Sequence, residues 1–290
     1  MSDRERLRMP GAVVEALVCP HCGGGLRPVG GALGCALGHS FDAARQGYVN
    51  LTVGRPPTAG DDREMVRARG EFFGAGHYAP LTARLVETAR ASWTGGLVVD
   101  AGAGTGHHLA AVLDALPGAY GLAVDVSRYA LRRAARAHPR AGAVGCDVWR
   151  GLPLGTGTVG LLLNVFAPRN GPEFARVLRP GGALLVVTPA PSHLAELRRD
   201  LGLIAVDPRK EERLAAKLQT RFTLERSEEV AVALRLTRAE AAVLVEMTPS
   251  ARHVAPDLLR ARLGARPEPV ETTAAFRLSV YRPGESAPRP

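Results

Sequence analysis

The sequence predicts an α/β fold in which a Rossmann-like, mostly parallel sheet follows a small N-terminal module. Residues 95–125 have the pattern of strand, glycine-rich turn, helix and second strand, and both strands end in an aspartate. Short apolar runs then alternate with helical patterns as far as residue 188, which is typical of a parallel sheet. Three cysteines and a histidine within residues 19–39 indicate a separate module held by a metal ion.

The stretch 95–125 is the nucleotide-binding unit of this fold. Its first apolar run, 97–99, is typical of a strand buried on both faces and ends at Asp100. Leucine and valine at helical spacing over 109–116 predict a helix, and the second strand, 121–124, ends at Asp125. The turn between the first strand and the helix contains glycines, which allow a tight turn and a close approach to a ligand.

The spacing of these glycines, Gly102, Gly104 and Gly106, indicates which nucleotide fits. A dinucleotide fingerprint reads G-x-G-x-x-G and lies beneath a pyrophosphate, whereas this turn reads D-x-G-x-G-x-G. Asp100 would repel an anion but not a cationic amino-acid group, and Asp125 can accept hydrogen bonds from both ribose hydroxyls. The combination resembles motif I and the following acidic motif of class I S-adenosylmethionine (AdoMet) methyltransferases. The alternative is an ordinary α/β crossover whose glycines only make turns.

The chain beyond residue 125 strengthens this resemblance. A helix is predicted over 128–138 and a third strand over 143–145, followed by Asp147, where the family contacts the adenine. An unbroken apolar strand is predicted over 159–165. The turn L-R-P-G-G before a fifth strand at 183–188 is a frequent companion of motif I in these enzymes. AdoMet is therefore the expected cofactor.

The C-terminal third completes the expected sheet. Helices are predicted over 194–201, 207–219 and 237–247, a strand with a polar break over 222–236, a short helix earlier over 173–178, and a final edge strand over 274–281. Thr237 and Glu240 have the spacing of a capping box. The domains expected are 1–55, a metal-binding module; 56–94, linker helices; 95–283, the AdoMet domain; and 284–290, a disordered tail.

The N-terminal module has the spacing of a structural zinc site. Cys19, Cys22, Cys35 and His39 form C-x2-C-x12-C-x3-H, and four ligands close a tetrahedron without leaving a position for catalysis. His21 competes as the fourth ligand but lies inside a two-residue loop. The alternative is a pair of buried cysteines and a chance second pair. Cys146 is remote and is interpreted as a buried strand-end thiol.

Composition sets further bounds. The 290 residues contain no apolar run long enough to span a membrane, and the first twenty residues lack the core of a signal peptide. We therefore expect a cytoplasmic protein that has no membrane partner. Four cysteines do not indicate a disulfide framework. The net charge of +9 favours a polyanionic partner, although the arginine, alanine and glycine richness of a GC-rich genome reduces the weight of this inference.

The order of short motifs along nearly the whole chain resembles one family. The motifs are C-P-x-C, C-x3-H-x-F-D, G-Y-V-N-L, G-H-Y-x-P-L, the glycine turn, F-A-P, R-P-G-G, T-P-x-P-x-H-L and M-T-P. Their order resembles the 23S ribosomal RNA guanine-N1 methyltransferases, which include enzymes conferring resistance to tylosin and related macrolides. The resemblance implies a seven-stranded class I fold and methylation of N1 of a guanine in a 23S rRNA hairpin near the macrolide-binding exit tunnel.

The resemblance also implies site residues. Zinc is held by the four ligands named above, and Tyr78, His107, His108 and His193 join the glycine turn around AdoMet. The full set of expected cofactor contacts is Tyr78, Asp100, Gly102, Gly104, Thr105, Gly106, His107, Asp125, Asp147 and His193. The alternatives are a tyrosine that packs a domain junction and a histidine that merely starts a helix.

The sequence pattern does not single out an Asp, Glu or His as the base that removes the guanine N1 proton, so no catalytic residue is assigned. Asn164, Arg169 and Asn170 follow the fourth strand and are candidates for base-edge contacts. That strand ends in N-V-F-A-P rather than N-P-P-Y, which argues against adenine-N6 methylation. Phe166 can stack on a flipped base, or it can be a core phenylalanine.

The RNA is expected to lie on arginines of the zinc module and linker: Arg27, Arg45, Arg55, Arg63, Arg67 and Arg69. A solvated charged helix is the alternative for the linker arginines. Two other functions stay open: a small-molecule methyltransferase with the zinc module as substrate cover, and a nucleic-acid binder with a degenerate AdoMet fold. The sequence does not decide which guanine is modified, whether the protein is a homodimer, or whether its role is housekeeping or antibiotic resistance.

Overall fold

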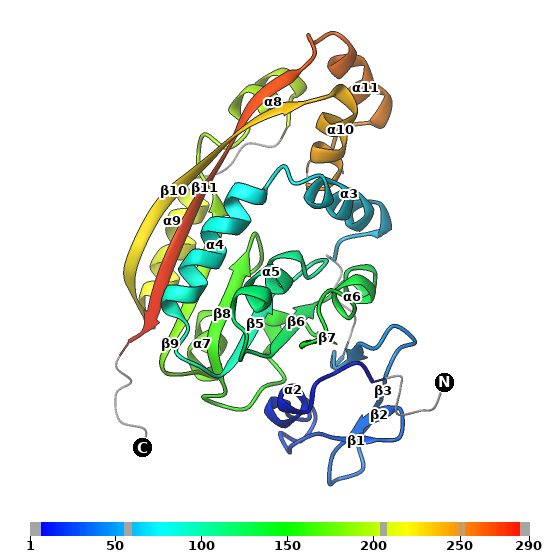
Figure 1. The fold of residues 1–290 in the computed structure, drawn as a ribbon, viewed down its shortest axis with the longest axis vertical. Coiled ribbons are helices and arrows are strands. Elements are labelled where there is room, and N and C mark those ends of the chain that lie inside the picture. Colours follow the sequence, from blue (N-terminus) through cyan, green and yellow to red (C-terminus); the bar gives the residue numbers. More distant parts are fainter. Residues whose placement is uncertain (1–6, 55–59, 204–207, 249, 251–252, 285–290) are drawn as a thin grey trace.

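The computed structural model describes residues 7–54, 60–203, 208–248, 250 and 253–284 (Figure 1). Its centre is an eight-stranded sheet in the order β10-β11-β9-β8-β5-β6-β7-β4. The strands are β4 (Val49–Asn50), β5 (Leu97–Ala101), β6 (Gly121–Asp125), β7 (Ala141–Gly145), β8 (Val159–Val165), β9 (Leu178–Pro189), β10 (Phe222–Leu236) and β11 (Val270–Pro283). The strands β4 to β9 pair in parallel, and β11 runs antiparallel between β9 and β10.

This order confirms the predicted fold class. If β5 is counted as the first strand of the AdoMet domain, the strands β7-β6-β5-β8-β9 have the doubly wound order 3-2-1-4-5. The antiparallel β11 lies between β9 and the edge strand β10. The order reverses between β5 and β8, and ligands bind such sheets outside the carboxyl ends of the strands at that point. Asp100 and Asn164 are each the last residue but one of their strands, β5 and β8, so both lie at the switch point.

Helices cover both faces of the sheet (Figure 1). They are α2 (Gly11–Ala16), α3 (Arg63–Gly74), α4 (Ala79–Ser92), α5 (His107–Ala115), α6 (Arg128–Ala134), α7 (Gly171–Val177), α8 (Ala195–Leu201), α9 (Pro208–Gln219), α10 (Arg238–Glu246) and α11 (Pro256–Gly264), with a 3₁₀ turn, η1, at Val148–Arg150. One buried cluster joins α3, α4, α5, α8 and α10 to one face of the sheet. A second joins α2, α7 and the zinc module to the other face.

The N-terminal module extends the sheet rather than standing apart from it. Its three strands, β1 (Arg27–Val29), β2 (Ala32–Gly34) and β3 (Ser40–Asp42), form an antiparallel sheet of their own. The next strand, β4, pairs in parallel with β7, so Val49 lies opposite Val144. Leu17 also bridges to Leu154. The eighth strand was not predicted, because a two-residue strand has no periodicity of its own.

The prediction that 274–281 forms an edge strand was wrong. The strand β11 lies inside the sheet, and β10 is the edge. The polar side chains that gave the alternating pattern face the neighbouring strand: the Ser279 hydroxyl lies 2.9 Å from that of Ser227, and Arg277 pairs with Glu229 at 3.1 Å. A polar residue that is satisfied by the next strand looks the same in the sequence as one that faces water.

Other boundaries agree closely with the prediction. The capping box of Thr237 and Glu240 is present at the start of α10. The helix expected over 128–138 ends earlier, at Ala134. The tail is described only at its first residue, since 285–290 lie outside the described residues, as do Arg55 and Pro249. Within the described part of the chain, no helix combines the length and apolarity that a membrane span needs.

Candidate functional site

The turn after β5 requires glycine for two reasons: its backbone conformation and its close packing. Gly102, Gly104 and Gly106 have φ values of 87°, 55° and 80°, in the left-handed region. A Cβ on Gly102 would lie 2.3 Å from the Cβ of Ala167, in the loop after β8. A Cβ on Gly104 would meet only the side chain of Arg69. The turn therefore packs tightly against the β8 loop at one glycine and is open at the next.

Two carboxyl groups lie at the carboxyl ends of β5 and β6. Asp125 accepts hydrogen bonds from the backbone N–H groups of Gly104 and Ser127, both at 2.8 Å, so it holds the glycine turn in place. Asp100 is 1% exposed, and among the described residues its Oδ1 has no hydrogen-bond partner. Burial, with the nearby charge of Asp125, raises the pKa of Asp100 to about 8.

This arrangement fits AdoMet. A buried carboxyl group with an unpaired oxygen favours a cationic ligand, because the cation stabilises the ionised form. Asp125 keeps acceptor capacity on both oxygens for ribose hydroxyls, since each accepts one backbone donor and has further lone pairs. Asp147, expected at the adenine, begins η1 and accepts the Trp149 N–H at 3.0 Å.

Tyr78 and His193 meet on the ring of Phe276, which the sequence did not single out. Tyr78 is 3% exposed, and its ring lies edge-on to Phe276 at 5.0 Å. His193 lies 4.9 Å from the same ring, and its Nδ1 is 3.0 Å from the carbonyl oxygen of Ala275. Burial raises the pKa of Tyr78 and lowers that of His193 to about 4. Phe276 lies in the middle of β11, where an aromatic residue in the sequence indicates only a core position.

His107 and His108 begin α5 and share one partner. The hydroxyl of Thr82 lies 3.4 Å from Nε2 of His107 and 3.3 Å from Nδ1 of His108. His108 is buried, and burial first, then the charges of His107 and Arg69, lowers its pKa to about 3. It is therefore neutral at pH 7, and its Nε2 has no partner among the described residues. Thr105, in the turn, is half-buried.

Asn164 ties the two loops of the switch point together. It is fully buried, and its Nδ2 donates to the carbonyl oxygens of Ala101, at 3.1 Å, and Pro168, at 2.9 Å. Its Oδ1 has no hydrogen-bond partner in the described part of the chain. Phe166, two residues later, has φ 55° and is 43% exposed. Such a backbone costs a bulky residue about 1–3 kcal/mol, and strain of this kind clusters at functional sites.

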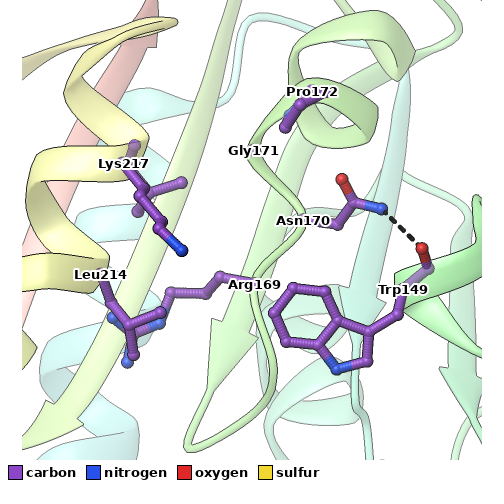
Figure 2. Close-up of a pocket in the computed structure, with 8 residues that line it drawn as sticks. Trp149, Arg169, Asn170, Gly171, Pro172, Leu214 and Lys217 are labelled. Atoms are coloured by element: carbon purple, nitrogen blue, oxygen red, sulfur yellow. Dashed lines mark hydrogen bonds between the residues drawn. The ribbon is translucent and has the colours of Figure 1, made fainter. Parts of the chain in front are cut away.

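Arg169 and Asn170 line a hollow of about 140 Å³ between the β8 loop, η1 and α9 (Figure 2). Asn170 donates to the carbonyl oxygens of Val148, at 2.8 Å, and Trp149, at 3.4 Å, and accepts the N–H of Glu173 at the start of α7. Its side chain is thus engaged in positioning two loops. Arg169 and Lys217 line the hollow, and Trp149 is 59% exposed beside them.

The four predicted zinc ligands come together. The ligand atoms of Cys19, Cys22, Cys35 and His39 all lie within 4.8 Å of one another. The two sulfur atoms of Cys22 and Cys35 are 3.7 Å apart, and Nδ1 of His39 is 3.5 and 3.3 Å from the sulfur atoms of Cys19 and Cys35. A tetrahedron with zinc–sulfur bonds of about 2.3 Å has edges of roughly 3.7 Å, so the donor set fits zinc.

His21, the competing candidate, and the remote Cys146 both lie outside the ligand cluster. The ring of His21 lies 5.0 Å from that of His39 and stacks on Phe41 at 5.9 Å, so it packs beside the cluster. Cys146 donates to the carbonyl oxygen of Gly151 at 2.9 Å, and burial raises its pKa to about 12. It is an inert thiol away from the cluster.

The predicted arginine face divides into two parts. Arg27, Arg45 and Arg63 are exposed. Arg67 pairs with Glu71 and Glu246, at 2.7 and 2.8 Å. Arg69 points inward instead: it pairs with Asp61, donates to the carbonyl oxygen of Met247 and approaches Gly104.

Comparison with known proteins agrees with this geometry. Residues 17–52 match the zinc-ribbon family described as RlmA, N-terminal. The chain is 49% identical, over 93% of its length and 98% of the relative's, to the 23S rRNA (guanine(748)-N(1))-methyltransferase of Streptomyces fradiae. It is 56% identical, over 92% and 97%, to a Micromonospora griseorubida protein provisionally named a 23S rRNA (guanine-N(1)-)-methyltransferase. YxjB of Bacillus subtilis, with the same provisional name, is 31% identical over 63% and 67%.

Replacement of Cys35 by serine is expected to abolish zinc binding, because it removes one of four ligands from a closed tetrahedron. Metal analysis of the purified chain should give one zinc per molecule for the wild type and less than about a fifth of that for the variant. Cys146→Ser is the matched control and should keep its zinc. A full complement of zinc in Cys35→Ser would contradict the assignment.

AdoMet binding is expected to release a proton from Asp100 at pH 7. The pKa of about 8 leaves this carboxyl group mostly protonated in the free protein, and a nearby cation lowers that pKa. Affinity should therefore rise by about fivefold or more between pH 6 and pH 8 and then level off. Calorimetry in buffers of different ionisation enthalpy measures the proton, and the difference should vanish in Asp100→Asn. Proton release that is unchanged in Asp100→Asn would exclude this group.

Proposed function

We propose, because this chain belongs to the family of 23S rRNA (guanine-N1) methyltransferases, that it transfers a methyl group from AdoMet to N1 of the guanine that corresponds to position 748 of 23S rRNA. The observation that carries the proposal is the joint presence of an intact glycine turn, two carboxyl groups at the strand ends and a zinc cluster in one chain 49% identical to the Streptomyces fradiae enzyme. Its cofactors are AdoMet and Zn²⁺.

The residues of the switch point have distinct roles in this reaction. AdoMet, when bound, supplies a methyl group on a positively charged sulfur. Asn164 places a buried, unpaired carbonyl oxygen at the end of β8, where it can accept a hydrogen bond from the Watson–Crick edge of guanine. Phe166 is held outward by its strained backbone, so its ring can stack on the extruded base.

Methyl transfer forms the N1–CH3 bond as the S–CH3 bond breaks, and the N1 proton passes to solvent water. Loss of this proton leaves negative charge on guanine O6, which a cation stabilises. Arg169, five residues beyond Asn164, is the candidate for this contact. The nearby histidines are poor bases: burial lowers the pKa of His108 to about 3 and of His193 to about 4. We therefore assign the reaction to positioning and charge stabilisation.

The zinc cluster serves the fold of the N-terminal module and its docking beside the cofactor domain. Its four ligands leave no open position for substrate. Because β4 extends the main sheet, the exposed arginines Arg27 and Arg45 are carried at a fixed distance from the strand ends. This supports RNA recognition by the module. A small-molecule substrate is less well supported, since the relatives at 56% and 49% identity are named as rRNA methyltransferases.

Expression of the protein in a sensitive bacterial strain is expected to create a reverse-transcriptase stop at a guanine of the 23S rRNA hairpin, because a methyl group on N1 blocks Watson–Crick pairing. The same cells, with the protein in the cytoplasm, should tolerate more tylosin than cells carrying Asp125→Ala. A stop without any change in tylosin tolerance would separate the modification from drug resistance. The absence of a stop, with folded protein present, would contradict the proposed reaction.

Asn164→Ala is expected to lower the single-turnover methylation rate by roughly 10²-fold, and Arg169→Ala by about tenfold or more, because each removes a preorganised contact to the base. Saturating AdoMet and RNA are used, so the rate reports the chemical step. Asn170→Ala is the control for loop position, since its side chain is occupied by backbone groups. Rates within twofold of wild type for Asn164→Ala and Arg169→Ala would remove both from the chemistry.

A further inference from the structure

A hollow of about 300 Å³ lies between α3 and α6. We name it the α3–α6 hollow. Its lining consists of Arg63, Glu64, Val66, Arg67, Tyr129, Arg132 and Arg133. The two helices lie side by side, with α6 on the side of the zinc module (Figure 1). Neither the reaction nor the cofactor contacts described above use this surface.

The hollow has an excess of positive charge. Arg63, Arg132 and Arg133 are exposed, and none of them pairs with a carboxylate within the described ranges. The charge of Arg67 is met by Glu71 and Glu246, which leaves Glu64 as the acid in the lining. Unpaired like charges that converge on one concave surface raise the local potential and attract an anion.

The ring of Tyr129 contacts two arginine side chains at this surface. The guanidinium group of Arg128 lies 4.9 Å from the centre of the Tyr129 ring, and that of Arg132 lies 5.8 Å from it. Arg128 also donates to the hydroxyl of Tyr129 at 2.9 Å. A guanidinium group held against a ring keeps its N–H donors at the edge, where they can bind an oxyanion.

A glycine in α3 leaves room for Arg133, the fourth arginine that lines the hollow. A Cβ at Gly70 would lie 1.9 Å from Nη1 of Arg133, so the guanidinium group rests where a side chain would otherwise stand. Arg63, Arg67 and Gly70 follow one another at helical spacing and share one face of α3. Arg69 lies on a different face, toward the glycine turn. The helix α3 therefore contacts the glycine turn with one face and lines the hollow with another.

The hollow is joined to the cofactor site by short contacts. The hydroxyl of Ser127, which begins α6, donates to the carbonyl oxygen of Asp61 at 2.6 Å. Ser127 follows Asp125 by two residues, and Asp61 pairs with Arg69. These contacts connect the start of α6 to Asp125 at the carboxyl end of β6 and to Arg69 of α3.

We propose that the α3–α6 hollow is a phosphate subsite that binds the sugar–phosphate backbone of the RNA next to the target guanine. Phosphodiester oxygens match the fork of guanidinium donors that Arg132 and Arg133 present, and contacts of this kind position a nucleic acid without reading its sequence. The inference rests on the proposed function, since it names where that RNA is held.

The test is RNA binding by Arg132→Gln/Arg133→Gln, measured by filter binding of a transcript of the 23S rRNA hairpin at several salt concentrations. We expect affinity at least about tenfold lower than wild type, and a slope of log affinity against log salt that is smaller by about 1 to 2. The matched control is Arg90→Gln/Arg221→Gln, which removes the same charge from exposed arginines near the opposite edge of the sheet. It should stay within about twofold of wild type in affinity and keep the slope.

A second variant separates binding from stability. Gly70→Ala places a methyl group where the guanidinium of Arg133 rests, while alanine favours the helix. We expect unchanged or higher thermal stability and RNA affinity several-fold lower. Gly74→Ala, in the same helix with nothing within 4 Å of the added Cβ, should bind RNA as the wild type does.

Equal RNA affinity for Arg132→Gln/Arg133→Gln and its control would overturn the subsite and leave the proposed function intact. Loss of AdoMet affinity with unchanged RNA affinity would also overturn it, because the arginines would then act on the cofactor site. Failure of the wild-type protein to methylate the hairpin would instead remove the proposed function, and the subsite with it.

Discussion

The site depends on the close contact between the loops after β5 and β8. The Cα hydrogen of Gly102 faces the methyl group of Ala167, with no room for a side chain, and Asn164 ties the carbonyl oxygens of Ala101 and Pro168 to one amide. These contacts fix the glycine turn and the loop after β8 relative to each other. Because both loops follow strands of one parallel sheet, they lie together at the switch point, where we propose that cofactor and base edge meet. Strain at Phe166 is tolerated there because the surrounding structure holds the loop.

Charge in the molecule is arranged by burial as well as by pairing. Asp100 and His108 are buried beside the turn, and burial keeps both mostly neutral at pH 7. The arginines divide in a similar way: Arg69 is drawn inward by Asp61, whereas Arg132 and Arg133 stay exposed without acidic partners among the described residues. Arg132 and Arg133 therefore remain available on the surface where RNA is proposed to bind.

The sequence predicted the local units of this architecture well. The zinc spacing, the two strands whose carboxyl ends carry Asp100 and Asp125, and the capping box of α10 depend on neighbours within a few residues, and all are present. Long-range partners were not predictable. Phe276 contacts Tyr78 and His193, which come from distant parts of the chain. The strand β11 lies inside the sheet because it pairs with both β9 and β10, and Ser279 and Arg277 contact side chains of β10. The inward turn of Arg69 likewise depends on Asp61 and on the end of α10, which helical spacing does not reveal.

We propose that this site transfers the methyl group of AdoMet to N1 of a guanine. The most direct measurement is nucleoside mass spectrometry of unmethylated 23S rRNA after incubation with the zinc-loaded protein and AdoMet that carries a deuterated methyl group. The account predicts labelled 1-methylguanosine at close to one per RNA molecule, which disappears in Asp125→Ala. Label in another nucleoside, or no label from folded protein that binds AdoMet, would contradict it.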